Sequence, residues 1–230
     1  MTRVDLVLVH GAFHGPWCFD VVRPLLYERG IAAIAPELPL DSLAGDVAVV
    51  REELDALDGP TVLLGHSYGG TVVTWAGEHP AVRSLVYLTA GVPDIGEGIG
   101  SGPPRELAIP TPAGFVPGSG GAISVEASAA AGLFYSDADP AFASAWAARL
   151  RPTRFVAGEV VPQAAWRSRP SDYVLCQDDA VLPAATQRWL ADRAGSRVWE
   201  LPGGHSPFLA RPAALADALV AIVRARVPAT

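Results

Sequence analysis

The chain carries a serine whose surroundings are typical of a catalytic nucleophile. Ser67 stands at the centre of the stretch Gly-His-Ser-Tyr-Gly at 65–69, directly after the apolar run 61–64. A buried strand that ends in Gly-x-Ser-x-Gly and continues into a helix makes a sharp turn, which lifts the serine hydroxyl clear of the sheet. The turn needs a strained backbone angle at the serine, and glycines two residues to either side avoid a clash. We therefore expect Ser67 to act as a nucleophile.

A serine of this kind needs a base that takes its proton, and the base needs a carboxylate that orients it. In folds with this turn the order along the chain is serine, acid, histidine. Asp178 follows the predicted strand 173–176 and His205 follows the predicted strand 197–201, so both stand at carboxyl ends of strands. We expect His205 to act as general base and then as general acid, with Asp178 fixing its tautomer. Asp179 competes for the acid role, and spacing alone does not separate the two.

The chemistry also needs two backbone N–H groups that hold the oxyanion of the intermediate. One comes from the residue after the nucleophile, Tyr68, and the other from the loop after the first strand. That loop is 10–13, and Ala12 is the donor that we expect. His10 and His14 have a spacing that matches no usual pair of metal ligands, and no acidic side chain stands beside them. We interpret both as hydrogen-bonding groups of the loop and expect neither a metal nor a cofactor.

Composition excludes several other classes of protein. The 230 residues are enough for one α/β domain, and 50% of them are hydrophobic, but no apolar run approaches the ~20 residues that span a bilayer. The net charge of −7 argues against a nucleic-acid surface. All 17 basic residues are arginine, and the lack of lysine excludes Schiff-base chemistry, a phosphate-loop lysine and a Ser-Lys dyad.

Cysteine usage and the start of the chain favour a cytoplasmic setting. Cys18 and Cys176 are the only cysteines, too few for a disulfide framework, and Asp5 falls where a signal peptide would be apolar. We expect a protein that acts on a small molecule, with neither a nucleic-acid nor a membrane partner. Nothing in the pattern of surface residues decides the oligomeric state.

The predicted strands and helices alternate in both end regions of the chain. This alternation is typical of a mostly parallel sheet with helices on both faces, an α/β fold. We expect Asp41 or Ser42 to cap the second helix. The predicted strands are 4–9, 31–35, 61–64, 84–89, 173–176 and 197–201, and the predicted helices are 16–29, 43–57, 70–78, 183–194 and 212–227.

The middle of the chain is rich in glycine and proline and has few strand-like runs. We expect two short helices there, 125–135 and 140–150, the second opened by Asp139 as cap and Pro140 at its first position. We interpret this segment as a cap over the carboxyl edge of the sheet, where substrates bind in open α/β folds. The predicted organisation is a core part at 1–92, the cap at 93–170 and a second core part at 171–230.

Aromatic side chains of the cap could line an apolar substrate pocket, although aromatics at such positions also pack as ordinary core. Residues of the core loops are expected to border the same pocket. The candidate pocket residues are Gly11, Phe13, Phe115, Phe134, Trp146, Trp166 and Ser206.

Four stretches of the chain together resemble one group of the α/β-hydrolase superfamily. The group contains plant hydroxynitrile lyases, methyl-ketone and methyl-salicylate esterases and bacterial EstC-like esterases. The resemblance lies in His-Gly-Ala-Phe-His-Gly-Pro-Trp at 10–17, Gly-His-Ser-Tyr-Gly-Gly at 65–70, Gln-Asp at 177–178 with Leu-Pro at 182–183, and Gly-Gly-His at 203–205. It covers nearly the whole chain outside the cap and implies an α/β-hydrolase fold with a Ser-His-Asp triad. In that family the Asp before Leu-Pro is the catalytic acid, which favours Asp178 over Asp179.

Two positions depart from the lyases of that group. Gly11 stands where the plant lyases carry threonine, and Ser206 stands where they carry lysine. Lyase chemistry thereby loses the hydroxyl that holds the cyanohydrin and the ammonium that stabilises cyanide. Gly11 is the arrangement of the esterases, and the arginine-only, alanine-rich composition looks bacterial. The resemblance thus implies a serine hydrolase that cleaves a small, largely apolar carboxylic ester through an acyl-enzyme on Ser67.

Two alternatives remain open at this point. The first is a non-hydrolytic enzyme on the same scaffold, a lyase or a biosynthetic cyclase, with His205 as base, because a fold does not determine a function. The second is a protein that binds a small molecule without converting it.

Overall fold

Six short segments pair into one parallel sheet in the computed structural model, which describes residues 4–109, 112–155 and 158–227. The order β2-β1-β3-β4-β8-β9 places β1 and β3 side by side near the middle, and each neighbouring pair runs parallel. The predicted sheet is therefore confirmed. The strands are β1 (Leu6–Val9), β2 (Ala33–Ile34), β3 (Thr61–His66), β4 (Val82–Leu88), β8 (Ser171–Cys176) and β9 (Arg197–Leu201).

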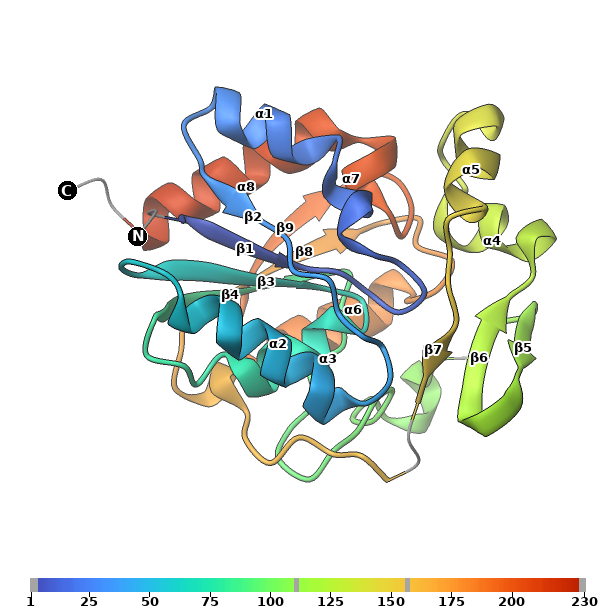
Figure 1. The fold of residues 1–230 in the computed structure, drawn as a ribbon, viewed down its shortest axis with the longest axis horizontal. Helices are drawn as coiled ribbons and strands as arrows, with labels where there is room; N and C mark the ends of the chain where they lie inside the picture. Colours follow the sequence, from blue (N-terminus) through green and yellow to red (C-terminus); the bar gives the residue numbers. More distant parts are fainter. Residues whose placement is uncertain (1–3, 110–111, 156–157, 228–230) are drawn as a thin grey trace.

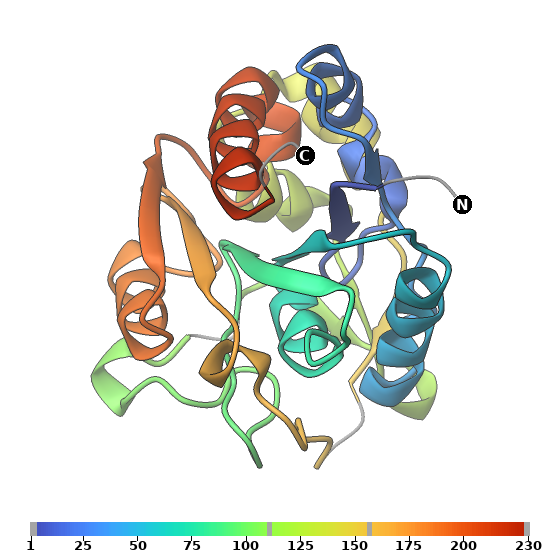
Figure 2. The same cartoon turned by 90° about the vertical axis from the view of Figure 1, so that its left-hand side faces the viewer.

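Helices cover both faces of this sheet, as Figure 2 shows in a view turned by 90° from that of Figure 1. Along β1 the side chains alternate between two apolar clusters, Leu6 and Leu8 in one and Val7 and Val9 in the other. Such alternation explains why the central strands read as continuous apolar runs. The helices on the first face are α1 (Val22–Glu28) and α8 (Pro212–Arg226), and those on the second are α2 (Leu43–Asp55), α3 (Gly69–Ala76) and α6 (Ala184–Arg193).

Helix starts follow the capping residues of the sequence. The hydroxyl of Ser42 accepts the N–H of Gly45 at 3.1 Å, so Ser42 rather than Asp41 caps α2. Short helical turns complete the core, η1 (Pro16–Phe19) before α1 and α7 (Pro207–Ala210) before α8. Within the described residues, no helix combines the length and the apolar character that a membrane crossing needs.

The segment between β4 and β8 contains the two predicted short helices and a small sheet that the sequence did not predict. Asp139 caps the second helix through the N–H of Ala141 at 2.9 Å, with Pro140 at its first position, as predicted. The elements are η2 (Arg105–Leu107), β5 (Phe115–Pro117), η3 (Ser119–Gly121), β6 (Ala122–Val125), α4 (Ala127–Phe134), α5 (Pro140–Ala147), β7 (Thr153–Arg154) and η4 (Ala165–Arg167).

This segment, called the cap below, places its β5-β6-β7 sheet and its helices α4 and α5 beyond the carboxyl ends of the parallel strands (Figure 1). The three strands pair antiparallel, and they are only two to four residues long. The chain passes from β2 on one side of β1 to β3 on the other, so a crevice opens at the carboxyl ends of β1 and β3. The loops that follow these two strands meet there.

Candidate active site

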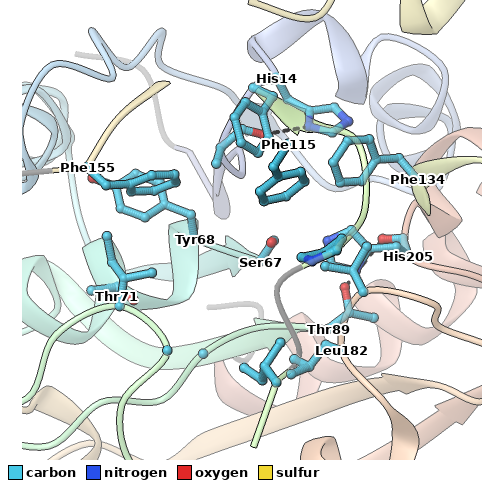
Figure 3. A pocket seen from close by; sticks show the side chains of 18 of the residues that line it. His14, Ser67, Tyr68, Thr71, Thr89, Phe115, Phe134, Phe155, Leu182 and His205 are labelled. Carbon is cyan, nitrogen blue, oxygen red and sulfur yellow. Dashed lines mark hydrogen bonds between the residues drawn. The ribbon is translucent and has the colours of Figure 1, made fainter. Parts of the chain in front are cut away.

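The turn after β3 has the strained geometry that its glycines predict. Ser67 has a φ of 53°, in the region that side-chain-bearing residues rarely adopt. A Cβ on Gly65 would overlap the backbone of Gly69, and a Cβ on Gly69 would lie 2.6 Å from the carbonyl oxygen of Val9. Glycine is therefore required at both positions, and the tight turn projects the hydroxyl of Ser67 into a cavity (Figure 3).

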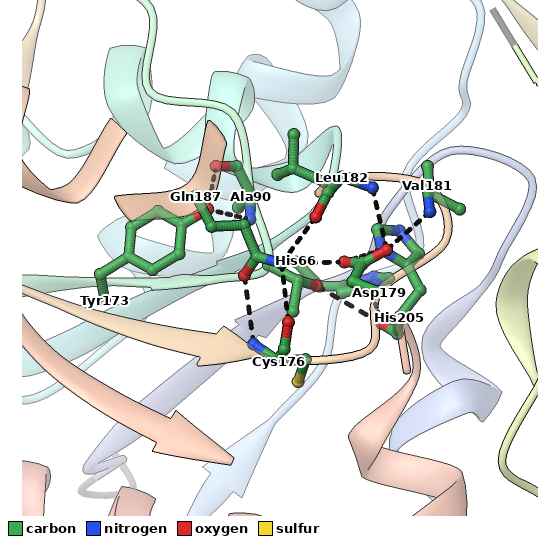
Figure 4. A network of polar contacts seen from close by, with 10 residues as sticks. His66, Ala90, Tyr173, Cys176, Asp179, Val181, Leu182, Gln187 and His205 are labelled. Carbon is green, nitrogen blue, oxygen red and sulfur yellow. Dashed lines mark hydrogen bonds and ion pairs between the residues drawn. The ribbon is translucent and has the colours of Figure 1, made fainter. Parts of the chain in front are cut away.

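His205 faces the same cavity (Figure 3), and a buried carboxylate holds its ring (Figure 4). Its Nδ1–H donates to Oδ2 of Asp179 at 2.8 Å, and both side chains are almost completely buried. The other carboxylate oxygen of Asp179 accepts the N–H groups of Val181 at 2.7 Å and Leu182 at 2.9 Å. These bonds compensate for the burial of the carboxylate and fix its orientation toward His205.

The structure corrects the choice between the two neighbouring aspartates. Asp178 is exposed, and its carboxylate accepts the N–H of Gly203 at 3.2 Å instead of the imidazole of His205. Asp179 is the residue that turns inward, so the predicted pairing of Asp178 with His205 is wrong by one position. The reason lies in the turn, because only the carboxylate of Asp179 meets the two N–H groups that follow it.

A buried glutamine holds that turn in place (Figure 4). The side chain of Gln187 donates to the carbonyls of Cys176 at 3.0 Å and Leu182 at 2.7 Å, and accepts the N–H of Cys176 at 3.2 Å. It also approaches Oδ2 of Asp179 at 3.4 Å. Gln187 thereby ties α6 to the end of β8 and to the carboxylate. Sequence reasoning missed this residue, since its role depends on contacts that no local motif encodes.

The loop after β1 lies beside the serine. Ala12 and Tyr68, the two predicted oxyanion donors, both line the cavity, and the chain at Tyr68 leads directly into α3. Phe13 adopts a φ of 65°, and its N–H donates to Oγ1 of Thr153 at 2.7 Å. The amide of Phe13 is therefore engaged by the cap.

His10 and His14 serve the loop as hydrogen-bonding groups, as predicted. The Nδ1–H of His10 donates to the carbonyl of Gly11 and that of His14 to the carbonyl of Ala12, each at 2.9 Å. Burial lowers the pKa of His10 to about 4 and that of His14 to about 3, so both rings are neutral near pH 7. Among the described residues, no group of three or more His, Cys, Asp or Glu side chains is placed to hold a metal ion.

His66 holds the backbone of His205 through a hydrogen bond. Its Nε2–H donates to the backbone carbonyl of His205 at 2.9 Å, and the two rings lie 4.8 Å apart. Burial lowers the pKa of His66 well below its usual range, so its ring stays neutral. The residue positions the loop that carries His205 and does not itself line the described cavity.

Tyr68 is anchored on the side away from the serine. Its hydroxyl donates to Oδ2 of Asp46 at 2.6 Å, and the other oxygen of this buried carboxylate accepts the N–H of Leu40 at 2.8 Å. Burial raises the pKa of Asp46 and that of Tyr68. The phenol therefore remains protonated and acts as a hydrogen-bond donor that holds the start of α3 against α2.

The cavity has a volume of about 330 Å³ and an apolar wall (Figure 3). Three predicted pocket residues, Phe13, Phe115 and Phe134, line it. The sequence missed several others, because they come from cap loops and from the turn after β8 whose path no motif predicts. The described lining residues are Ala12, Phe13, His14, Ser67, Tyr68, Thr71, Thr89, Gly91, Ile99, Gly100, Ile109, Pro112, Phe115, Ile123, Phe134, Phe155, Val181, Leu182 and His205.

The other four predicted pocket residues lie outside this described lining. Trp146 packs between Tyr135 and Phe142 at ring distances of 5.7 and 5.8 Å, so it belongs to the packing of α4 against α5. Trp166 donates its indole N–H to the carbonyl of Pro93 at 2.9 Å and packs against the core. Both tryptophans follow the alternative that the sequence left open, ordinary packing.

The remaining two predicted pocket residues are Gly11, which lies next to Ser67 in the fold, and Ser206, which follows His205 in the sequence. A Cβ on Gly11 would lie 2.9 Å from Nδ1 of His66 and 3.0 Å from Cβ of Ser67, so a larger residue would press on the serine. Ser206 is completely buried, and its hydroxyl has no hydrogen-bond partner among the described residues.

Comparison with known proteins identifies the family of the chain. The model of the alpha/beta hydrolase family matches residues 6–218. The chain belongs to that family. It shares 39% identity over 105 residues with a pyrethroid hydrolase of Sphingobium wenxiniae, a match that covers 39% of this chain and 37% of the relative. It shares 26% identity over 255 residues with methylesterase 2 of Arabidopsis thaliana, which covers 96% of each chain.

A solved structure extends the likeness over nearly the whole chain. The crystal structure of a pyrethroid hydrolase from Sphingobium faniae JZ-2 superposes with a TM-score of 0.78 at 27% identity, and the match covers 97% of this chain and 98% of that one. The cap is included in this coverage. The predicted membership of the α/β-hydrolase superfamily and the predicted fold are thus confirmed.

Proposed function

We propose that the protein is a carboxylic-ester hydrolase that works through an acyl-enzyme on Ser67. The observation that carries this proposal is the buried pair of His205 and Asp179, 2.8 Å apart, which faces the same cavity as the strained serine. A neutral imidazole whose Nδ1–H is held by a carboxylate presents Nε2 as a base toward a nearby hydroxyl. Asp179 takes the role that the sequence assigned to Asp178.

Acylation begins with attack of the Ser67 oxygen on the ester carbonyl carbon, while Nε2 of His205 takes the hydroxyl proton. The carbonyl electrons move onto oxygen, and the N–H groups of Ala12 and Tyr68 hold the resulting oxyanion. Collapse of this intermediate breaks the bond to the alkoxide, which receives the proton from His205. Asp179 stabilises the imidazolium between these two transfers.

Deacylation repeats the sequence with water. His205 takes a proton from water, the hydroxide attacks the acyl carbon, and the same two N–H groups hold the second oxyanion. Release of the serine oxygen, protonated by His205, yields the carboxylic acid. Water is the only co-reactant, so this reaction requires no metal and no cofactor.

The lining of the cavity favours a small, neutral and largely apolar ester. Four phenylalanines line the described part, and His14, one of the two histidines on its wall, is neutral near pH 7. A charged acyl or alcohol group would lose its hydration against this surface without gaining a partner. The names of the relatives, a pyrethroid hydrolase and a methylesterase, agree with ester cleavage as the reaction class.

The test combines covalent labelling with an ester panel. The test treats wild type, Ser67→Ala and a control variant, Ser168→Ala, with a fluorophosphonate and measures their intact masses by mass spectrometry. Ser168 is chosen for the control because it is an exposed serine. We expect one adduct on wild type and on Ser168→Ala and none on Ser67→Ala. The same three proteins are then assayed with neutral aryl and alkyl esters, where Ser67→Ala should lose at least about 10⁴-fold in kcat.

Other outcomes would select the alternatives. A Ser67→Ala variant that keeps ester turnover would disprove the acyl-enzyme. A well-folded wild type that neither labels nor cleaves any ester would favour a non-hydrolytic reaction with His205 as base, or a binding protein.

A further inference from the structure

The oxyanion loop, residues 10–14, is held in place by the cap as well as by its own side chains. Two cap residues reach this loop across about 140 positions of sequence, Arg151 and Thr153. The N–H of Arg151 donates to the carbonyl of Phe13 at 2.9 Å, and Oγ1 of Thr153 accepts the N–H of Phe13 at 2.7 Å. Both backbone groups of Phe13 are thus fixed by the cap.

In the two peptide groups that flank Ala12, nearly every N–H and C=O group has a hydrogen-bond partner within the protein. The carbonyl of Gly11 accepts from His10, and the carbonyl of Ala12 accepts from His14. Because C=O and N–H point in opposite directions in a trans peptide, fixing the Gly11 carbonyl also fixes the direction of the Ala12 N–H. This N–H is the group that the proposed mechanism uses as oxyanion donor.

The histidine tautomers follow from the partners on the far side of each ring. Nε2 of His10 accepts the N–H of Leu38 at 3.1 Å, and Nε2 of His14 is 3.0 Å from the hydroxyl of Tyr135 on the cap. A carbonyl can only accept, so Nδ1 of each ring must carry the proton that reaches the loop. The remaining support of the Ala12–Phe13 peptide is a single side-chain acceptor, the hydroxyl of Thr153.

Thr153 is itself well placed for this task. Its side chain is 1% exposed, and it stands at the start of β7, paired with Ile123 of β6. Phe13 keeps its unusual φ of 65°, and such a conformation persists only where the surroundings determine it. Without an acceptor at 153, the buried N–H of Phe13 would be unpaired, and rotation of the Ala12–Phe13 peptide toward another partner would become favourable.

From these contacts we propose that Thr153 is a positioning residue for the oxyanion hole, which acts through the Ala12–Phe13 peptide and couples the docked cap to catalysis. This proposal rests on the proposed ester hydrolysis. Thr153 touches neither the serine nor the substrate in this scheme. Its hydroxyl holds the loop so that the N–H of Ala12 points at the position of the developing negative charge.

Two matched pairs of proteins isolate the hydroxyl. Wild type and Thr153→Val differ by exchange of the hydroxyl for a methyl group, and Thr153→Ser and Thr153→Ala differ by the hydroxyl alone. We expect kcat to fall about tenfold to a hundredfold within each pair, less than the ~10²–10³ that loss of an oxyanion donor costs. KM should change by less than about twofold, because ground-state contacts to the ester remain.

A transition-state analogue separates positioning from plain support of the fold. A trifluoromethyl ketone adds to Ser67 and forms a tetrahedral oxyanion, whereas the corresponding alcohol binds without forming one. Across the four proteins the inhibition constant of the ketone should rise by the same factor by which kcat/KM falls, and that of the alcohol should stay constant.

Each outcome decides a different claim. Suppose that wild type cleaves esters in a reaction that depends on Ser67, and that kcat is unchanged in Thr153→Val and Thr153→Ala. This result overturns the role of Thr153 and leaves the proposed function intact. Absence of ester turnover in wild type overturns both. If the valine variant does not fold, the serine and alanine pair decides, and failure of both hydroxyl-free variants to fold marks Thr153 as structural and overturns the proposal.

Discussion

The sheet edge and the cap contribute different kinds of groups to the cavity. From the sheet edge come the strained serine, the imidazole that Asp179 holds, and the loop whose carbonyls accept from His10 and His14. The cap lines the cavity with apolar side chains such as Phe115, Ile123 and Phe134. For the proposed hydrolysis, this difference assigns bond making to the sheet edge and substrate choice to the cap, with Thr153 as a cap residue that also holds the oxyanion loop.

The largest loss of activity is expected at the sheet edge, where the two neighbouring aspartates can be compared. Asp179→Asn should lower kcat by about 10³- to 10⁴-fold, because the amide no longer holds the imidazole in its correct tautomer. Asp178→Asn should stay within about threefold of wild type, since an amide oxygen can still accept the N–H of Gly203. Steady-state kinetics on both variants, with circular dichroism as a check of folding, gives the answer. Equal losses would show that the turn acts as a unit.

The next effect concerns the free energy of unfolding in acid, which we expect to depend on His10 in the loop at the sheet edge. The pKa of His10 is about 4 in the folded protein, below its ordinary value of about 6.5. Above pH 6.5 neither state binds the proton. As the pH falls below 6.5 the unfolded chain takes it up first, so the free energy of unfolding decreases until about pH 4. At pH 5 this amounts to about 2 kcal/mol for His10 alone.

Urea unfolding of wild type and His10→Asn at pH 7 and pH 5 measures this contribution. At pH 7 the variant should have a lower free energy of unfolding than wild type, because the N–H of Leu38 loses its acceptor. Between pH 7 and pH 5, however, its free energy of unfolding should decrease by about 2 kcal/mol less than that of wild type. The window lies above the ordinary range of carboxyl groups, which limits their part in the change. Parallel pH dependences in both proteins would refute the assignment.

The same two regions differ in how far sequence reasoning reached. The strand 197–201 was predicted with its observed bounds, and Ser67 and His205 lie where the motif and the chain order placed them. These features are local, since a glycine pattern or an apolar run encodes them within a few residues. The choice between Asp178 and Asp179 is not local, because it depends on which carboxylate meets the N–H groups of the turn.

The strands and the cavity-lining residues of the cap could not be predicted from the sequence for a related reason. Its strands are two to four residues long and pair antiparallel, too short for an alternating pattern to stand out. That a cap residue is aromatic did not tell whether it lines the cavity or packs inside the cap. Phe134 lines the cavity, whereas Trp146, on the neighbouring helix, packs against other cap residues. Which side of a short helix faces the sheet depends on tertiary contacts.

A substitution on the cap wall sharpens the comparison. The ring of Phe115 lies edge-on to that of Phe13 at 5.2 Å and borders the cavity. Phe115→Ala should raise KM for an apolar ester about tenfold, the equivalent of ~1.4 kcal/mol of lost contact, and leave kcat within about threefold. The ratio of kcat/KM for a bulky and a small ester should fall accordingly. A loss confined to kcat would break the division between the two regions.

The smallest effect is expected at Trp146, the matched aromatic that lies off the described cavity wall. Trp146→Phe keeps a ring between Tyr135 and Phe142, so KM and kcat should both stay within about twofold of wild type, while the free energy of unfolding falls by about 1 kcal/mol. Kinetics and urea unfolding of this variant are compared with those of Phe115→Ala. Because Tyr135 also lies 3.0 Å from His14, a change in kcat would mean that the packing of α4 against α5 reaches the oxyanion loop through this hydroxyl. The cap would then position the reacting groups through its helices as well as through Thr153.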